Sequence, residues 1–420
     1  MQSFRFVHSA DIHLDSPLRG LTGQDSAAVA LIRRATGEAF TALVSRTIEE
    51  GASFLLIAGD LYDRDWQDYQ TGLFFVREAA RLRKAGVDVY LIYGNHDAAN
   101  QVRRKLALPD NVKIFSHRKP ETKRIPELGV ALHGQSFGRR DVSDNLARSY
   151  PPRVPGDVNI GLLHTSLAGT EGHANYAPCS LDDLVNKGYD YWALGHVHAP
   201  AVHHRRPYVV YSGVLQGRHI RETGPKGAFL VSVEDGAVSG VEAFQVDLVR
   251  WEVVKVPAED CVAFQDLCDA IRDRVEEAAE ERSDGRLLAC RIELTGRTEA
   301  HSLALASEER LLAEARATAE GLGDGRAWIE RLVVRTESPR NATDGASAAD
   351  VLGDIGVAAK DEELREGLQK HIGELIRRLP HEVREGADDE MLRAAADSDY
   401  DQLVTLAGRY ALARLTATGE

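Results

Sequence analysis

Short hydrophobic runs alternate with longer amphipathic stretches along the first half of the chain. Short apolar runs bounded by turn residues predict buried strands, whereas residues 27–50 and 66–84 have the apolar spacing of helices that cover one face of a sheet. This alternation is typical of layered α/β domains. The runs that we interpret as buried strands leading into polar clusters are residues 4–9, 53–58, 87–93 and 191–194.

The same pattern divides the chain into parts. Shorter strands after residue 207 predict a second sheet, so the first domain is expected to be an α/β sandwich of two sheets flanked by helices. The next part alternates strands and helices and predicts a small α/β capping domain, before a linker and a helical C-terminal part. The strands assigned to the second sheet are 208–211, 228–233 and 241–248. The predicted parts are residues 1–248, 249–336, 337–348 and 349–420.

Each of the four buried runs ends in side chains that bind metal ions. Strands of layered α/β enzymes deliver such side chains from their carboxyl ends. Mixed nitrogen and oxygen ligands suit two divalent ions that share one carboxylate, and they suit manganese or iron better than calcium or magnesium. We expect Asp60 to be the shared carboxylate, because Gly59 lets the backbone turn sharply before it. The seven candidate ligands are Asp11, His13, Asp60, Asn95, His164, His196 and His198.

Three neighbouring residues have predicted roles in the chemistry. Hydrolysis of a phosphodiester needs an activated water, positive charge around phosphorus and a proton for the leaving oxygen. His96 directly follows Asn95 and cannot easily reach the same ion, so we interpret it as the general acid. We expect Asp97 to orient or charge this histidine, and Asp63 to support a ligand from behind.

The order of these clusters resembles that of one superfamily. The order Asp-x-His, Gly-Asp-x-x-Asp, Gly-Asn-His-Asp, His and Gly-His-x-His is similar to that of the calcineurin-like metallophosphoesterases. The run His-Ser-Ala-Asp-Ile-His-Leu-Asp-Ser-Pro-Leu at 8–18 resembles the SbcD-like DNA repair exonucleases, especially their YhaO-type branch. The run Leu-Gln-Gly-Arg-His-Ile-Arg-Glu-Thr-Gly-Pro-Lys-Gly at 215–227 also resembles that branch. Asp63 stands where some relatives carry histidine, and residues 211–214 depart from the expected loop pattern.

The resemblance implies a function and assigns the ligands. It implies a two-sheet metallophosphoesterase fold and an enzyme that cuts DNA in the 3′→5′ direction and nicks single strands. It also implies an SMC-like coiled-coil ATPase partner that docks on helices after the cap, and a homodimer is a further expectation. His96 would be the histidine that stabilises the transition state. One manganese ion would be held by Asp11, His13, Asp60 and His198, and the other by Asp60, Asn95, His164 and His196.

The distribution of charge changes what the net charge implies. The chain carries −14, but residues 1–250 hold 29 basic against 28 acidic side chains, and residues 101–150 hold 11 against 5. A locally basic segment can bind a phosphate backbone even in an acidic protein, so DNA remains an expected partner. The predicted DNA contacts are Arg103, Arg104, Lys105, Arg218 and His219.

The sequence also predicts the cellular compartment. The N-terminus has no basic region or cleavage site of a secretory signal, and no apolar run approaches the roughly 20 residues of a membrane span. The four cysteines lack paired metal-ligand spacing, which suits a reducing compartment. We therefore expect a cytoplasmic protein without a membrane partner.

Two other functional classes remain open from the sequence. The first is a phosphatase or phosphodiesterase for a small molecule or a protein on the same scaffold. Protein phosphatases of this superfamily usually show Gly-Asn-His-Glu, where this chain has Asp97. The second is a regulatory scaffold for the ATPase, against which the complete ligand set argues. In the C-terminal part, apolar stripes at 363–378 and 401–415 either pack against the same chain or bind the partner's coiled coil.

Overall fold

The structure is a computed structural model that describes residues 3–14, 16, 27–63, 69–98, 107–167, 176–323, 325–339, 362–378 and 390–417. The chain forms two compact units. The first contains Met1–Glu252, Arg282–Ala289 and Asp324–Ala327. The second contains Val253–Glu281, Cys290–Gly323 and Trp328–Glu420. The predicted boundaries between the catalytic, capping, linker and helical parts stay predictions.

The first sheet has six strands in the order β12-β11-β1-β2-β3-β4. Strands β1 to β4 are parallel, whereas β11 runs antiparallel to β1 and β12 antiparallel to β11. The parallel strands are β1 (Phe4–Ser9), β2 (Phe54–Ala58), β3 (Asp88–Ile92) and β4 (Val112–Ile114). The other two are β11 (Gly227–Glu234) and β12 (Ala237–Gln245).

The second sheet also has six strands, in the order β5-β6-β7-β8-β10-β9. Its four inner strands are parallel and its two edge strands antiparallel to their neighbours. The inner strands are β6 (Val130–Gly134), β7 (Val158–His164), β8 (Tyr191–Gly195) and β10 (Tyr208–Tyr211), and the edges are β5 (Glu121–Ile125) and β9 (Ala201–Arg205).

This topology confirms the two-sheet α/β class and corrects one assignment. We expected the strands at 208–211, 228–233 and 241–248 to build the second sheet together. Only the first belongs to it, as β10; the other two correspond to β11 and β12, which extend the first sheet. Phe4 of β1 faces Val233 of β11 across this antiparallel pair. Such pairing joins segments more than 200 residues apart, and local patterning carries no signal for it.

The main core lies between the two sheets. Alternate residues of each buried strand point into this layer, as the two-residue period of a strand requires. The Phe6 and Phe54 rings stack at 5.0 Å, and the Tyr191 ring of the second sheet meets Phe6 edge-on at 5.4 Å. Residues one position along, such as Val7 and Leu55, point to the outer face instead. This fixed alternation sets the direction of each side chain where the strands end.

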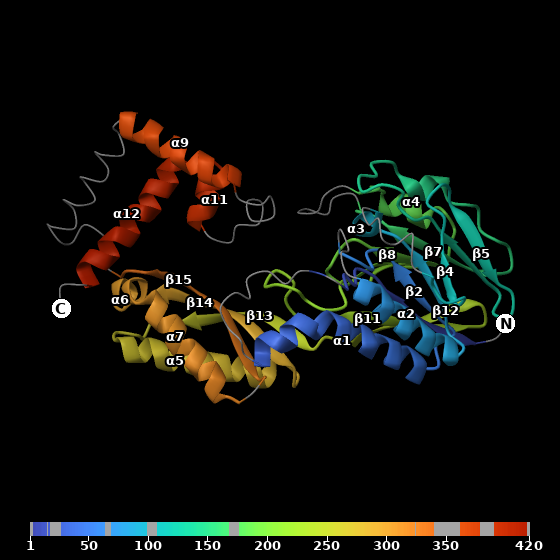
Figure 1. The fold of residues 1–420 in the computed structure, drawn as a ribbon, viewed down its shortest axis with the longest axis horizontal. Coiled ribbons are helices and arrows are strands. Elements are labelled where there is room, and N and C mark those ends of the chain that lie inside the picture. The colour runs from blue at the N-terminus through green and yellow to red at the C-terminus, as the bar shows by residue number, and fades with distance from the viewer. Residues whose placement is uncertain are drawn as a thin grey trace. The chain divides into compact units, whose positions relative to one another are not determined.

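Helices cover the outer face of each sheet. In Figure 1, α1 (Ala27–Glu49) and α2 (Tyr69–Lys84) lie side by side along the first sheet, and α4 (Leu181–Val185) lies beyond the second. Phe40 and Leu43 of α1 pack on the first sheet, and Leu184 of α4 packs on the second. A 3-10 turn, η2 (Leu146–Ser149), and the one-turn helix α3 (Asn95–Ala98) complete this unit. The domain is thus layered as helix, sheet, sheet and helix.

The second unit combines a small sheet with helices. Strand β14 is central in the order β13-β14-β15, and α12 packs along α6 and α11. The strands are β13 (Val249–Pro257), β14 (Leu287–Arg297) and β15 (Ala327–Glu337). The helices are α5 (Phe264–Glu281), α6 (His301–Ala306), α7 (Glu308–Gly321), α9 (Glu362–Arg378), α11 (Glu390–Ala396) and α12 (Tyr400–Ala417). In the described part of the chain, no helix is both long and apolar enough to cross a membrane.

Candidate metal centre

The loops at the carboxyl ends of five strands converge on one cluster of side chains. After β1 and β2, Asp11 N donates to Gly59 O at 3.0 Å, and His13 N donates to Asp60 O at 3.0 Å. The second sheet joins them through His164, the last residue of β7, whose Nδ1 lies 3.0 Å from Ala58 O of β2. Asn95 begins α3 directly after β3, and His196 and His198 follow β8. All seven predicted ligands therefore lie at the same edge of the sandwich.

Four of these candidate ligands have a positive φ angle, which residues with a Cβ rarely adopt. The φ angles are 49° at Asp11, 50° at His13, 51° at Asp60 and 99° at His196. Positive φ costs a non-glycine residue of order 1–3 kcal/mol and persists only where surrounding contacts impose it. Here, the His196 amide donates to both carboxylate oxygens of Asp11, at 2.9 and 3.1 Å. Backbone strain concentrated on the candidate ligands is typical of a functional site, where stability alone would not select such a geometry.

One group of potential ligand atoms comprises Asp11, His13 and His198, which offer atoms within 4.8 Å of one another. His13 is fully buried, and neither of its ring nitrogens has a hydrogen-bond partner among the described residues. Asp63 Oδ1 lies 3.8 Å from His13 Nδ1, which is beyond hydrogen-bonding distance. Buried polar atoms are almost always satisfied, so an unpartnered imidazole beside a carboxylate fits a metal ligand.

A second group comprises Asp11, Asp60 and His164. His164 Nε2 lies 2.9 Å from Asn95 Oδ1 and 3.3 Å from Asp60 Oδ2, and the His196 ring lies 5.3 Å from the His164 ring. Carboxylate, amide and imidazole atoms that converge in this way match the donor set of a transition-metal ion. Asp11 contributes to both groups, whereas the shared role that we expect for Asp60 stays a prediction.

The electrostatics of the cluster also suit a bound cation. Burial raises the pKa of Asp11, even though the charges of His164 and His198 oppose this shift. Burial also acts to raise the pKa of Asp60, but the charge and hydrogen bond of His164 hold it below its usual value. Burial lowers the pKa of His13 to about 3, with the Arg218 charge adding to the shift. The His13 imidazole is therefore neutral at pH 7 and keeps a lone pair for a metal ion.

Glycines in the motifs leave room for these side chains. A Cβ on Gly94 would lie 2.3 Å from Asp60 Oδ1 and 2.8 Å from the His164 ring. A Cβ on Gly59, whose φ is +100°, would lie 2.3 Å from His164 Nδ1. Approaches below 3.0 Å force a shift, so any larger residue at either position would displace a candidate ligand. The glycines before Asp60 and Asn95 are thus part of the cluster.

His96 lies beside the candidate ligands and contacts Asp63. His96 Nδ1 lies 2.7 Å from Asp63 Oδ1, and its ring meets the His13 ring at 4.9 Å. We expected Asp97 to orient this histidine. That role stays a prediction, and Asp97 accepts hydrogen bonds from the amides of Leu61, Tyr62 and Gly94, at 3.2, 2.9 and 3.0 Å. Asp97 therefore fixes the two ligand loops together, and Asp63 faces His96.

The pKa values of His96, Asp63 and Asp97 are not all shifted in the same direction. Burial acts to lower the pKa of His96, but the hydrogen bond to Asp63 and the charge of Asp60 raise it overall. Burial acts to raise the pKa of Asp63, but its interactions with His13 and His96 hold it well below the usual range. Burial and the nearby charge of Asp60 raise the pKa of Asp97 to about 7. A protonated His96 beside an ionised Asp63 is a suitable proton donor.

The five residues predicted to contact DNA differ in whether the structure describes them and in how exposed their side chains are. Arg103, Arg104 and Lys105 lie outside the described residues. The Arg218 side chain is only 12% exposed, and its Nη2 lies 2.9 Å from Glu222 Oε1. This burial favours a supporting role for Arg218 over the phosphate contact that we expected. His219 keeps a side chain that is 53% exposed, with Nε2 3.6 Å from Glu222 Oε1.

Sequence reasoning missed Glu222. Its side chain is 5% exposed, and its Oε1 lies 2.7 Å from Nδ1 of His198. The residue lies within the run at 215–227 that carries the family resemblance, between basic residues and a glycine turn. That position was the available signal, but only the fold brings the loop against His198.

Comparisons with known proteins agree with this geometry. The family profile described as calcineurin-like phosphoesterase matches residues 4–200, and the profile described as metallophosphoesterase YhaO, middle domain, matches residues 251–337. The uncharacterized metallophosphoesterase YhaO of Bacillus subtilis is 36% identical over 295 residues, which cover 69% of this chain and 71% of that protein.

More distant relatives are named as repair proteins. The DNA double-strand break repair protein Mre11 of Methanopyrus kandleri is 26% identical over 288 residues, which cover 61% of this chain and 60% of that protein. Among solved structures, a dimetal phosphatase from Danio rerio aligns with a TM-score of 0.36 and 11% identity, covering 55% of this chain and 93% of that one. The YhaO match and the profile over the ligand motifs decide the family. This chain belongs to the calcineurin-like metallophosphoesterases, which hydrolyse phosphoesters with divalent metal ions, and within them to the YhaO type.

Proposed function

We propose that this chain is a DNA phosphodiesterase that acts with two manganese ions, as a 3′→5′ exonuclease and a single-strand endonuclease. The observation that carries the proposal is the convergence of the two ligand groups described above at one sheet edge, next to a third group of potential ligand atoms formed by His96, Asp63 and His13. Two adjacent ions are the arrangement suited to displacement at phosphorus. Similarity to proteins named for DNA double-strand break repair supports DNA as the substrate.

The residues present fit the two ions. Asp11, His13, Asp60 and His198 would hold one ion, and the unpartnered nitrogens of buried His13 support this assignment. Asp60, Asn95, His164 and His196 would hold the other. Bound ions at this edge would generate hydroxide from water near pH 7 and neutralise charge on the phosphate. Mixed histidine, amide and carboxylate ligands favour manganese over magnesium, which prefers oxygen ligands and retains its waters.

The protein's own groups provide the proton for the leaving oxygen. Asp63 occupies Nδ1 of His96 at 2.7 Å, which leaves Nε2 as the nitrogen able to protonate a leaving group. The hydrogen bond to Asp63 and the charge of Asp60 raise the pKa of His96, which favours its protonated form. The His96 amide also donates to Asp60 Oδ1 at 2.9 Å, so the acid and a ligand move as one unit. Asp97 holds the loops after β2 and β3 together by accepting hydrogen bonds from three backbone amides.

A comparison of two substrates tests the proposal. The purified chain with manganese is expected to degrade linear duplex DNA from 3′ ends and to nick circular single-stranded DNA. It is expected to hydrolyse bis-p-nitrophenyl phosphate far more slowly. His96→Asn is the control: activity should fall about 10²–10⁴-fold, as when a general acid is removed, with metal content unchanged. Hydrolysis of small phosphoesters with intact DNA would instead show a phosphatase or small-molecule phosphodiesterase.

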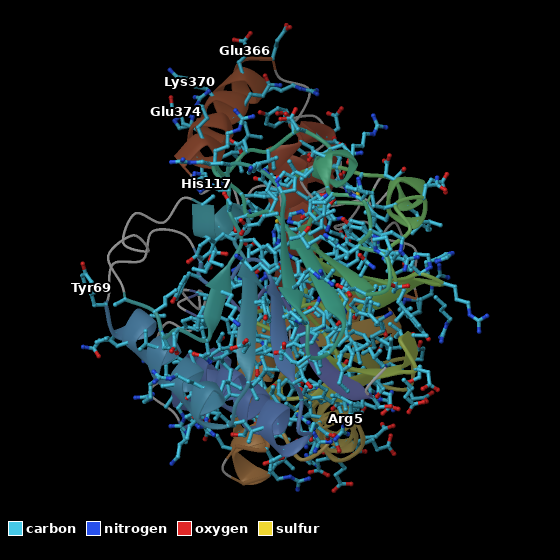
Figure 2. All side chains as sticks on the ribbon, turned by 90° about the vertical axis from the view of Figure 1, so that its right-hand side faces the viewer. Arg5, Tyr69, His117, Glu366, Lys370 and Glu374 are labelled. Carbon is cyan, nitrogen blue, oxygen red and sulfur yellow. The ribbon has the colours of Figure 1, made fainter. Side chains whose placement is uncertain are left out.

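We further propose that helix α9 contributes to binding a coiled-coil ATPase. Leu368 and Leu375 lie seven residues apart on one face of α9 and are 39% and 60% exposed. Figure 2 shows Glu366, Lys370 and Glu374 in a row along one side of the same helix. An exposed apolar stripe beside a charged row is suited to a helical partner.

Replacement of the two leucines tests this partner proposal. Leu368→Ser with Leu375→Ser should abolish co-purification with the ATPase while nuclease activity persists. Glu366→Gln on the charged row is the matched control and should retain the partner. If the double variant only converts a homodimer to a monomer in sedimentation, the face binds a second copy and the ATPase proposal is wrong.

A further inference from the structure

Behind His198 lies a buried carboxylate that is not among the predicted metal ligands. The Glu222 side chain is 5% exposed, and both of its oxygens accept hydrogen bonds. Oε1 lies 2.7 Å from His198 Nδ1 and 2.9 Å from Arg218 Nη2. Oε2 accepts a hydrogen bond from the Arg218 amide at 2.7 Å. A buried carboxylate with this many donors is fixed in position and stays charged through its pairing with Arg218.

The proximity of Glu222 determines which nitrogen of His198 can bind a cation. His198 Nδ1 lies 2.7 Å from Glu222 Oε1, which only accepts hydrogen bonds, and 3.3 Å from Arg218 Nη2, which only donates. The shorter contact, with the carboxylate, favours the proton of neutral His198 on Nδ1. Nε2 then carries the lone pair. Histidines that bind metals usually donate their other ring N–H to a carboxylate or carbonyl in this way, which fixes the tautomer and raises the basicity of the ligand.

Arg218 joins this pair to the second functional histidine. Its Nη2 binds Glu222, and its Nη1 lies 3.7 Å from Asp63 Oδ2. Asp63 Oδ1 in turn meets His96 Nδ1 at 2.7 Å. The planar guanidinium has a rigid fork of donors, which suits it to lie between two carboxylates. Glu222 contacts the candidate ligand His198, and Asp63 contacts the candidate acid His96. The Arg218 guanidinium therefore links the two carboxylates that hold these histidines.

The loop that carries both residues is itself tightly held. The Gln216 amide accepts from the Leu248 amide at 2.8 Å and donates to Val249 O at 2.8 Å. Trp251 Nε1 donates to Gly217 O at 2.9 Å. These bonds fix the backbone between Gln216 and Glu222 without touching either histidine. They therefore provide a way to separate loosening of the loop from removal of the carboxylate.

We infer that Glu222 and Arg218 are positioning residues. Glu222 fixes the tautomer and orientation of His198 for metal binding. Arg218 holds the carboxylates of Glu222 and Asp63 in fixed positions, so that His198 and His96 act together. The part that concerns His198 rests on the proposed metal site and not on DNA as the substrate, and the part that concerns His96 rests on its proposed role as the acid.

The first test uses metal binding and no substrate. In calorimetric titration with manganese, Glu222→Gln should weaken the binding of one ion by about 10–100-fold and leave the other unchanged. Nitrogen NMR of the metal-free wild type should show the His198 proton on Nδ1, and the variant should show a mixture of tautomers. Trp251→Phe, which removes a bond from the same loop, should lower the melting temperature while preserving both readouts.

Either of two results overturns the role of Glu222. One is unchanged manganese affinity and an unchanged His198 tautomer in folded Glu222→Gln. The other is a wild-type His198 protonated on Nε2, which decides the matter even if the variant does not fold. Neither readout involves DNA, so a failure of the proposed nuclease activity would leave this result intact.

The second test separates Arg218 as a positioning residue from Arg218 as a DNA-binding residue. Arg218→Lys keeps the charge but removes the fork of donors. It should lower kcat for bis-p-nitrophenyl phosphate by about 10–100-fold with little change in KM. A variant with normal kcat on this small ester and a raised KM for DNA would show that Arg218 binds phosphate instead, and would overturn its positioning role.

Discussion

Asp63 Oδ1 lies 2.7 Å from His96 Nδ1, so the acid that holds this histidine comes from the loop after β2 and not from the adjacent position in the sequence. The two residues lie 33 positions apart and meet only because parallel strands β2 and β3 end at the same edge. Asp97, directly beside His96, faces the backbone of the β2 loop. The pair therefore couples the second and third ligand loops.

Replacement of Asp63 should change the pH dependence of catalysis. Burial acts to lower the pKa of His96, but Asp63 and Asp60 raise it overall, so the protonated acid is present below this raised pKa and disappears as pH rises through it. Asp63→Asn removes the interaction that contributes most to raising the pKa of His96. The alkaline limb of kcat/KM for bis-p-nitrophenyl phosphate should therefore move to lower pH. A limb at the wild-type position in this variant would show that Asp63 does not set the acid.

Metal counting should distinguish the two buried aspartates. If Asp60 is the shared ligand, Asp60→Ala should lose more than one manganese equivalent per chain, because a bridging carboxylate serves both ions. Asp11→Ala should then lose chiefly one. Atomic absorption after dialysis measures this directly. Asp11 offers an oxygen to both ligand groups, so the reverse result would identify Asp11 as the bridge and refute our assignment of Asp60.

The buried histidine of β1 should make the metal-free protein sensitive to acid. Burial lowers the pKa of His8 from 6.5 to about 3, although a backbone hydrogen bond with Leu194 opposes this shift. Since the folded state disfavours the charged ring, stability is full above pH 6.5 and falls as pH drops toward 3, by up to about 1.4 kcal/mol per pH unit. Urea unfolding at pH 7.5 and pH 5 should show a larger decrease in stability for wild type than for His8→Gln. Equal decreases would contradict this account.

The basic segment should affect DNA binding and not the chemistry. Replacing Arg103, Arg104 and Lys105 with glutamine should reduce the salt dependence of DNA binding, by roughly 0.7–0.9 in log–log slope for each phosphate that the protein no longer neutralises. Hydrolysis of bis-p-nitrophenyl phosphate should be unaffected. Arg297→Gln, at an exposed position paired with Glu337, is the control. A slope that equals the wild-type value in the triple variant would place DNA elsewhere.

Local patterning predicted the strands that build the site. The run at 4–9 is β1. The runs at 53–58 and 191–194 differ from β2 and β8 by one residue at one end, and the run at 87–93 is one residue longer than β3 at each end. These strands are buried on both faces and read as continuous apolar segments, which gives a strong signal. Strand β4 has only three half-buried residues, Val112–Ile114, and β5 and β9 are edge strands with exposed positions. Short or half-exposed strands lack that signal, and we did not predict them.

Pairings between distant loops were not predictable from spacing. His96 and Asp97 are consecutive in α3, and consecutive helical residues point about 100° apart, so adjacency in the sequence was a poor guide to proximity. Glu222 approaches His198 because the loop after β10 packs against the loop after β8, where the Val214 amide donates to His198 O. Gln216 anchors the loop after β10 to Leu248 and Val249. The candidate ligands at strand ends could be predicted, because the geometry of a sheet places the ends of parallel strands together. The residues that orient them could not, because their positions depend on how distant loops pack, and local sequence patterns do not encode that packing.

The most direct test of the two-metal centre is anomalous diffraction from crystals grown with manganese. We predict two peaks at the carboxyl edge of the sheets, one next to His13 and His198 and the other next to Asn95, His164 and His196. Glu222 should contact His198 and neither ion. A single peak with saturating manganese, or peaks away from His13 and His164, would contradict the account.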